Sequence, residues 1–387
     1  MWGAIVAPFT ADKLAPDDMR RNPASFEPGA ALPAADDHLT TATRPLRAAG
    51  ESSRLGFLDG LRGIAALAVF FSHACDAVSP AYRAFVEPYL FLGNWGVVLF
   101  LFCSGFIIPV SLERQGSLAT FWTRRAFRLY PLYWLSVVVV AAFGIGEALD
   151  LLHGPPVQFL WLIVANLTMF QGFLRVPHLM ALYWTLTLEL MFYIIISVLY
   201  LLKISTRTAP ATVVLLLAMI VVELLVPQPF AFSYATHLLI ILAGLVAYRV
   251  HSGEASVATG IAVAILLPLM LIAPLLVDPS DPYRQLAWVV AQVGACAYFG
   301  IAFLRRARMV RPALTYLGRI SYSIYLLHPI VMAAIPRLSN PLLALLVWLV
   351  ALILTASASY RWIEQPAIAL GHRLTRAQGR EARGEGR

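Results

Sequence analysis

The chain has 387 residues, of which 60% are hydrophobic and only 13% are charged. Soluble domains carry about 25% charged residues. Disordered chains contain few aromatic residues, whereas 12% of this chain is aromatic. The composition therefore excludes both a soluble globular protein and a disordered one. Because the apolar runs are continuous rather than alternating, it predicts an all-α polytopic membrane protein and not a β-barrel.

The first 54 residues differ in composition from the rest. They are rich in Pro, Ala and Asp and show little hydrophobic periodicity. We expect residues 1–54 to be a disordered tail, or the result of a mis-assigned start codon, and not a signal peptide. Residues 55–365 are then the membrane domain, and residues 366–387 are a basic cytoplasmic tail.

Eleven apolar segments follow residue 57. Most have about 20 residues, enough to cross a hydrocarbon core of about 30 Å at 1.5 Å per residue. We expect spans at 57–79, 89–110, 129–148, 157–173, 182–202, 210–227, 231–250, 257–277, 285–304, 312–335 and 341–362.

The arginines near the span ends predict the orientation. The loops 111–128 and 305–311 and the tail 371–387 are rich in Arg, so we expect them to be cytoplasmic. The alternation of sides then requires segment 157–173 to begin and end on the outer side. We therefore expect about ten transmembrane helices with both termini cytoplasmic, and a re-entrant or interfacial helix at 157–173. The alternative is eleven crossings with the tail outside.

The remaining compositional features indicate no metal and no nucleic acid. The three cysteines lie inside apolar runs at unrelated spacings, which predicts small buried side chains and neither a disulfide framework nor a zinc site. The excess positive charge, +8 in total, lies mostly beside apolar segments. The expected partner is therefore a lipid bilayer.

Two ionisable residues of the first span share a helix face. Arg62 and His73 are 11 residues apart, which is three turns plus about 20° and an axial distance of about 16 Å. Such residues are rare in membranes and are candidates for function. The alternatives are that Arg62 extends to the interface and that His73 forms a hydrogen bond between helices.

Five segments in the same order resemble the bacterial acyltransferase-3 family of integral membrane O-acyltransferases. Arg62 and His73 match the family's Arg/Lys-x10-His motif, and Arg125 and Arg128 match its Arg-x-x-Arg motif. Leu190 departs from the family, in which many members carry a polar or acidic residue there. The resemblance extends over about residues 55–365 and is carried by segments 58–67, 94–106, 121–131, 183–193 and 321–329.

The resemblance implies the transfer of an acyl group, often acetyl, from acyl-CoA to a hydroxyl group. The expected acceptor is a carbohydrate: a cell-envelope polysaccharide, a lipid-linked sugar or an oligosaccharide. An alternative is the O-acylation of a secondary metabolite. We expect a multi-pass protein of the bacterial inner membrane, with acetyl-CoA as the most common donor of the family. The sequence leaves the oligomeric state and the exact acceptor open.

Three residues are the candidates for catalysis. His73 is the expected general base, because imidazole titrates near neutral pH. Glu189 is the preferred carboxylate partner of His73, with Asp76 as the alternative. Arg125 and Arg128, with Arg62 beside them, are expected to bind the phosphates of acyl-CoA. A structural role for Glu189 and a purely topological role for the arginines stay open.

Three further residues are expected to contact substrate. Tyr325 is a candidate donor to a developing oxyanion, although a packing role is also open. His328 precedes Pro329 and is expected either to contact the acceptor or to form a structural hydrogen bond. Asp76 lies one turn beyond His73. Direct transfer is the preferred route, and a transient acyl-histidine is the alternative.

Two non-enzymatic functions compete with this interpretation. A transporter or flippase would use the charged residues to line a passage, but the matching broken segments of many transporters are not apparent. A membrane scaffold would leave Arg62, His73 and Glu189 without a purpose.

Overall fold

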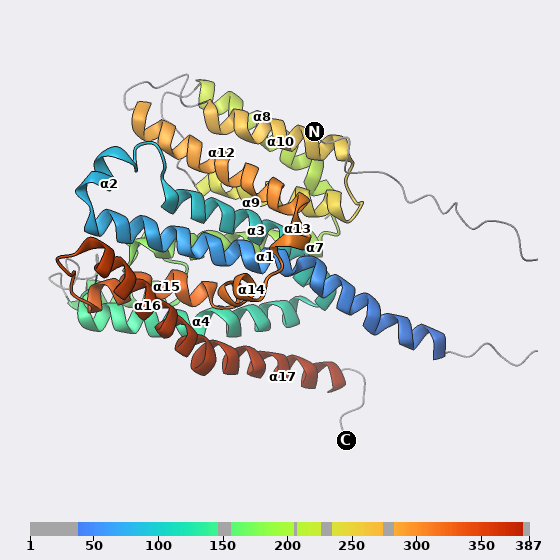
Figure 1. Ribbon diagram of the computed structural model, residues 1–387. Helices are drawn as coiled ribbons and strands as arrows, with labels where there is room; N and C mark the ends of the chain where they lie inside the picture. The colour runs from blue at the N-terminus through green and yellow to red at the C-terminus, as the bar shows by residue number, and fades with distance from the viewer. Residues whose placement is uncertain (1–37, 146–155, 205–206, 226–233, 274–281, 382–387) are drawn as a thin grey trace, which may run out of the picture. The chain divides into compact units, whose positions relative to one another are not determined.

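The structure is all-helical, as the composition predicts. The computed structural model describes residues 38–145, 156–204, 207–225, 234–273 and 282–381 (Figure 1), and no β-strand occurs within these ranges. Residues Ser53–Arg387 form one compact unit. Small parts of the predicted spans, such as residues 146–148 and 274–277, lie outside the described residues.

The described helices follow one another with short connections. They are α1 (His38–Val78), α2 (Pro80–Phe85), α3 (Leu92–Gln115), α4 (Leu118–Phe143), α6 (Pro156–Leu167), the 3₁₀-helix η1 (Ala181–Tyr183), α7 (Trp184–Leu201), α8 (Thr208–Leu225), α9 (Tyr234–His251), α10 (Val257–Ile272), α12 (Pro282–Leu304), α13 (Arg306–Met309), α14 (Pro312–Arg319), α15 (Ser321–Ala334), α16 (Pro341–Ser359), the π-helix η4 (Tyr360–Glu364) and α17 (Gln365–Glu381).

Eight helical segments of the described chain are long and apolar enough to cross a membrane, and α6, α10 and α15 are apolar but shorter. Helix α6 has 12 residues, which at 1.5 Å per residue reaches about 18 Å and falls short of a hydrocarbon core. This length agrees with a re-entrant or interfacial helix at 157–173. The number of crossings and the cytoplasmic position of both termini stay predictions.

The connection between α3 and α4 is much shorter than the sequence suggested. Most of the expected loop 111–128 is helical, because α3 continues to Gln115 and α4 begins at Leu118. Gly116 ends α3 in the left-handed conformation, with φ of 64°. Ser117 then caps α4 by accepting a hydrogen bond from the amide of Thr120. The arginines of this region therefore lie on a helix.

Three other segments also differ from the expected boundaries. The predicted span 312–335 is divided into α14 and α15 at Ile320. The predicted span 341–362 continues through η4 into α17, so that much of the expected tail 366–387 is helical. Residues 38–54, expected to be disordered, form the beginning of α1, while residues 1–37 and 382–387 lie outside the described residues.

Two glycines allow α3 and α9 to pack backbone against backbone. A Cβ on Gly105 would lie 1.9 Å from the carbonyl oxygen of Ile241, and one on Gly244 would lie 2.3 Å from that of Phe102. Small residues at such crossings let helices approach closely where lipid offers no hydrophobic driving force. In Figure 1, α3 lies between α1 and α9, so this contact helps to fix the helices around α1.

A buried ion pair joins the ends of the same two helices. The side chain of Arg249 on α9 is 2% exposed, and its guanidinium lies 2.6 Å from Glu113 of α3 and 2.6 Å from Glu254. Tyr248 also donates a hydrogen bond of 2.7 Å to Glu113. Removing one partner of such a buried pair leaves an uncompensated charge, which is strongly destabilising. Arg249 is therefore assigned to the stability of the fold.

The glycine contact predicts a large difference between two chemically identical substitutions. Gly105→Ala should destabilise the protein by about 1–3 kcal/mol, because its methyl group would overlap the backbone of α9. Gly300→Ala on α12 has no neighbouring atom within 4 Å of the added Cβ. It should be neutral or stabilising by about 0.5–1 kcal/mol. Thermal unfolding of both variants in one detergent checks this, and equal unfolding temperatures would contradict the packing account.

Candidate active site

A cavity lies along the face of α1 that carries Arg62 and His73. It has a volume of about 20 Å³, enough for about one water molecule. Its α1 wall is formed by Ala65, Ala66 and Val69. These residues occupy the turns between Arg62 and His73 on the same helix face. The cavity thus lies between the two residues that the sequence singled out.

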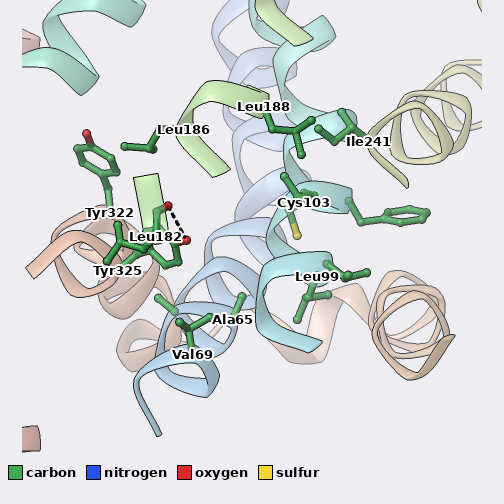
Figure 2. Close-up of a cluster of buried hydrophobic side chains, with 14 of the residues drawn as sticks. Ala65, Val69, Leu99, Cys103, Leu182, Leu186, Leu188, Ile241, Tyr322 and Tyr325 are labelled. Atoms are coloured by element: carbon green, nitrogen blue, oxygen red, sulfur yellow. Dashed lines mark hydrogen bonds between the residues drawn. The ribbon is translucent and has the colours of Figure 1, made fainter. Parts of the chain in front are cut away.

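The other walls come from α3, α7 and α15. They are formed by Gly96, Val97, Phe100, Leu101, Thr185, Leu186, Glu189, Tyr322 and Tyr325. Figure 2 shows several of these residues, including Val69, Leu186 and Tyr325, within the buried apolar cluster. The lining is largely hydrophobic, with the carboxylate of Glu189 and the two tyrosines as its polar members. An apolar lining with a few polar groups is typical of a ligand site.

Two histidines come together at one end of this face. The rings of His73 and His328 stack with centroids 5.3 Å apart and planes 20° apart. His328 is 1% exposed, whereas His73 is exposed. Depth counting from the sequence places these two residues at a similar level, and the structure agrees. No hydrogen bond of His73 is present within the described part of the chain.

A backbone carbonyl sets the tautomer of His328. Its Nδ1 atom lies 2.7 Å from the carbonyl oxygen of Tyr325. Because a carbonyl oxygen only accepts hydrogen bonds, Nδ1 carries the proton and Nε2 carries the lone pair. The buried Nε2 atom has no hydrogen-bond partner among the described residues. His328 can therefore accept a hydrogen bond from a bound hydroxyl group.

Arg62 lies toward the other end of the cavity. Its guanidinium carbon is 4.9 Å from the ring centroid of Phe100, which also forms part of the cavity wall. Its Nε atom is buried and has no hydrogen-bond partner within the described ranges. Arg62 interacts electrostatically with Glu189 and with Arg128. The structure thus brings Arg62 together with residues from α4 and α7.

A chain of contacts links Glu189 to the Arg-x-x-Arg segment. Tyr193, one turn after Glu189 on α7, donates a short hydrogen bond to a Glu189 carboxylate oxygen. Arg125 on α4 donates a hydrogen bond of 3.4 Å to the hydroxyl oxygen of Tyr193. Its guanidinium also lies over the rings of Phe121 and Tyr193, at 5.5 Å and 5.3 Å. Within the described contacts, Glu189 is joined to Tyr193 and Arg62 and not to His73.

The three arginines at the start of α4 have different surroundings. Arg124 donates a hydrogen bond of 3.1 Å to Thr375 on α17. Arg125 belongs to the chain of contacts with Tyr193, and Arg128 interacts electrostatically with Arg62 and with Glu364. The structure therefore separates Arg124, which connects two helices, from Arg125 and Arg128, which lie beside Arg62 and Glu189.

Tyr325 and Asp76 make structural contacts in addition to any role toward substrate. The hydroxyl of Tyr325 lies 2.8 Å from Thr185 Oγ1 and 3.3 Å from the carbonyl oxygen of Leu182, the second contact being drawn in Figure 2. Asp76 forms a two-point ion pair with Arg83 of α2, at 2.5 Å and 2.8 Å. Both side chains are thus occupied in this structure.

A polar cluster near the beginning of η1 adds a histidine outside the spans. Gln171 and His178 Nδ1 lie 3.1 Å apart, and the hydroxyl of Tyr234 lies 3.5 Å from His178 Nε2. Burial lowers the pKa of His178 below the ordinary value for imidazole, so its neutral form prevails at pH 7. Neutral His178 can accept or donate one hydrogen bond.

Sequence reasoning missed Glu364. This residue is the last of η4, it is 1% exposed, and Ser323 on α15 donates a short hydrogen bond to its Oε1 atom. It interacts electrostatically with Arg62 and Arg128. The available signal was an acid close to the apolar segment 341–362 and two residues before Pro366. Within the described residues, no group of three potential ligands could hold a metal ion.

Comparisons with known proteins agree on one family. The family model of the acyltransferase domain known as acyltransferase 3 matches residues 55–361. The chain is 32% identical over 149 residues to the acyltransferase MdmB of Streptomyces mycarofaciens, covering 36% of this chain and 38% of that protein. No solved structure matches the chain.

Two further relatives cover different shares of their own length. The putative acetyltransferase ORF330 of Acidianus two-tailed virus is 25% identical over 290 residues, which cover 69% of this chain and 80% of that protein. Nodulation protein 10 of Rhizobium leguminosarum bv. viciae is 29% identical over 158 residues, which cover 36% of this chain and 43% of that protein. The matched region is thus less than half of MdmB and of Nodulation protein 10. Its many apolar helices and the family match over most of its length show that this chain is a multi-pass membrane enzyme of the acyltransferase-3 family.

Proposed function

We propose that the protein transfers a short acyl group from acyl-CoA to a hydroxyl group of a carbohydrate, with His73 as the general base. The observation that carries this proposal is the cavity on α1 between Arg62 and His73. A cationic group and an imidazole at opposite ends of one apolar cavity suit an anionic thioester donor and a neutral alcohol. The family resemblance supplies the choice of a carbohydrate.

The arginines are suited to bind the donor. Acyl-CoA carries several phosphate charges, and guanidinium groups bind phosphate with paired, charge-assisted hydrogen bonds. Arg125 and Arg128 lie one turn apart on α4, and Arg128 interacts with Arg62. In the topology predicted from the sequence this side is cytoplasmic, where acyl-CoA is made.

The volume and lining of the cavity favour a short acyl group. A cavity of about 20 Å³ with apolar walls accommodates little more than the methyl group of an acetyl unit. Glu189 is the one carboxylate that lines it. We propose that Glu189 stabilises Arg62 and Tyr193 beside the thioester, and that it acts on His73 through the shape of the site rather than by direct contact.

The reaction follows from the placement of the two histidines. His73 removes the proton of the acceptor hydroxyl as its oxygen attacks the thioester carbonyl carbon. The carbon–sulfur bond then breaks, and the thiolate of CoA takes the proton back from the imidazolium. His328, with its lone pair on Nε2, accepts a hydrogen bond from the acceptor and orients it. An exposed His73 gives the acceptor access from the side opposite the arginines.

The role of His73 predicts a loss of transfer without a loss of donor binding. His73→Gln should lower kcat for transfer from acetyl-CoA by about 10²–10⁴-fold, because a general base contributes this much. Its Kd for CoA should stay close to that of the wild type. The measurement is acetyl-CoA turnover with purified protein in nanodiscs, supplied with membrane glycans. His251→Gln, at a histidine on α9 that contacts Phe106 and not the cavity, is the matched control.

Retention of most of the transfer rate in His73→Gln would refute the assignment of the base. A loss of both transfer and CoA binding would indicate a change in the fold, which thermal unfolding distinguishes.

The role of the arginines predicts a loss of donor affinity. Arg125→Gln and Arg128→Gln should each raise the KM for acetyl-CoA by roughly 10-fold to 100-fold, since a hydrogen bond to a charged group contributes about 1.5–3 kcal/mol. Arg124→Gln should have a much smaller effect, because this side chain is bound to Thr375. Steady-state kinetics over a range of acetyl-CoA concentrations makes the comparison, and equal KM values for all three variants would contradict the proposal.

The cavity predicts a preference for short acyl chains. Val69→Ala should raise the rate with butyryl-CoA relative to acetyl-CoA, because it removes two methyl groups from the cavity wall. Val137→Ala, also in the buried core but on α4 and outside the cavity, should leave this ratio unchanged. Competition between the two donors in a single reaction gives the ratio directly. A wild-type protein that prefers butyryl-CoA would contradict the short-chain proposal.

A further inference from the structure

Glu364 is buried in a position where a carboxylate is costly. Its side chain is 1% exposed, and its Oε2 atom has no hydrogen-bond partner among the described residues. A buried charge needs a partner of opposite sign or several hydrogen bonds. Ser323 is the one side chain that donates to it within the described hydrogen bonds, through Oε1. A neutral hydroxyl group alone does not compensate a carboxylate, so the cations near Glu364 become important.

The cations near Glu364 belong to the candidate active site. Glu364 interacts electrostatically with Arg128 and with Arg62. These two arginines also interact with each other, and like charges at such a distance repel. The other carboxylate of this region, Glu189, already accepts the hydrogen bond of Tyr193. Glu364 therefore supplies the second negative charge that the three arginines of the site require.

The local backbone explains how Glu364 reaches this position. It ends η4, a π-helical turn that interrupts the long helix formed by α16 and α17. Pro366 has no amide proton to donate to the carbonyl four residues earlier, which favours such an irregularity. Single π-turns within α-helices occur frequently at functional sites. Ser323 and Ser359, whose hydroxyl oxygens lie 3.3 Å apart, fix the carboxylate from α15 and α16.

We propose that Glu364 is a positioning residue for the donor site: it holds Arg62 and Arg128 together so that both are available to the acyl-CoA donor. This inference rests on the proposed function, because it assigns acyl-CoA as the ligand of these arginines. Two carboxylates against three arginines leave one excess positive charge for the donor. Without Glu364, the mutual repulsion of Arg62 and Arg128 would move their side chains apart before the donor arrives.

The test is CoA binding to the full-length protein in nanodiscs, measured by calorimetry. Glu364→Gln keeps the shape of the side chain and removes the charge, and it should raise the Kd for CoA by about tenfold or more. Glu364→Asp should restore part of the affinity. Ser323→Ala, which removes the hydrogen bond and keeps the carboxylate, should have an intermediate effect. Glu254→Gln, which removes a partner of Arg249 on another part of the chain, should leave CoA affinity unchanged.

The possible outcomes separate this inference from the proposed function. If the wild-type protein does not bind CoA, the proposed function fails, and the inference fails with it. If the wild type binds CoA and Glu364→Gln binds it equally well or more tightly, the positioning role alone is refuted. Thermal unfolding without CoA identifies a folding defect. If Glu364→Gln does not fold, Ser323→Ala decides: weaker CoA binding supports the role, and unchanged binding refutes it.

Discussion

The cost of placing charged side chains inside an apolar helix bundle determines the organisation of this protein. The described structure compensates Arg249 with two carboxylates at the ends of α3 and α9, away from the cavity. It treats Arg62 differently, since this side chain lies against Phe100 and leaves Nε without a partner. A fully paired arginine stabilises a fold, whereas an incompletely paired one beside a cavity is available to a ligand.

The same contrast separates the two halves of the candidate active site. Near Arg62, arginines and carboxylates from α1, α4, α7 and η4 form a charged region. Near His73, two imidazoles stack and the only fixed proton is the one that His328 gives to a backbone carbonyl. A charged donor is therefore expected at one end and a neutral alcohol at the other. Their reacting atoms can meet only in the cavity between them.

Much of this arrangement could be predicted from the sequence. The 11-residue spacing of Arg62 and His73 is a property of helix geometry, and the helix places both residues on one face as expected. The Arg-x-x-Arg spacing likewise predicted neighbouring guanidinium groups on one helix. The family resemblance also directed attention to Glu189, Tyr325 and His328. These residues come from distant parts of the chain and lie around the same cavity.

The remaining features depend on contacts between helices, which periodicity does not contain. The sequence favoured Glu189 as the partner of His73, but the described contacts join Glu189 to Tyr193 and Arg62. Glu364 was overlooked because a single acid after an apolar segment resembles an ordinary helix end. Its burial arises from η4 and from Ser323, 41 residues earlier in the chain. The loop 111–128 was expected to be long because arginines interrupt its hydropathy, while the turn itself is set by Gly116 and Ser117.

A cryo-electron microscopy map of the protein in nanodiscs with a stable acetyl-CoA analogue tests the central claim most directly. The account predicts phosphate density at Arg125 and Arg128, and the acetyl carbonyl in the cavity between Arg62 and His73. Density for the acetyl group on another face of α1, or for the phosphates at the end of the cavity near His73, would contradict it.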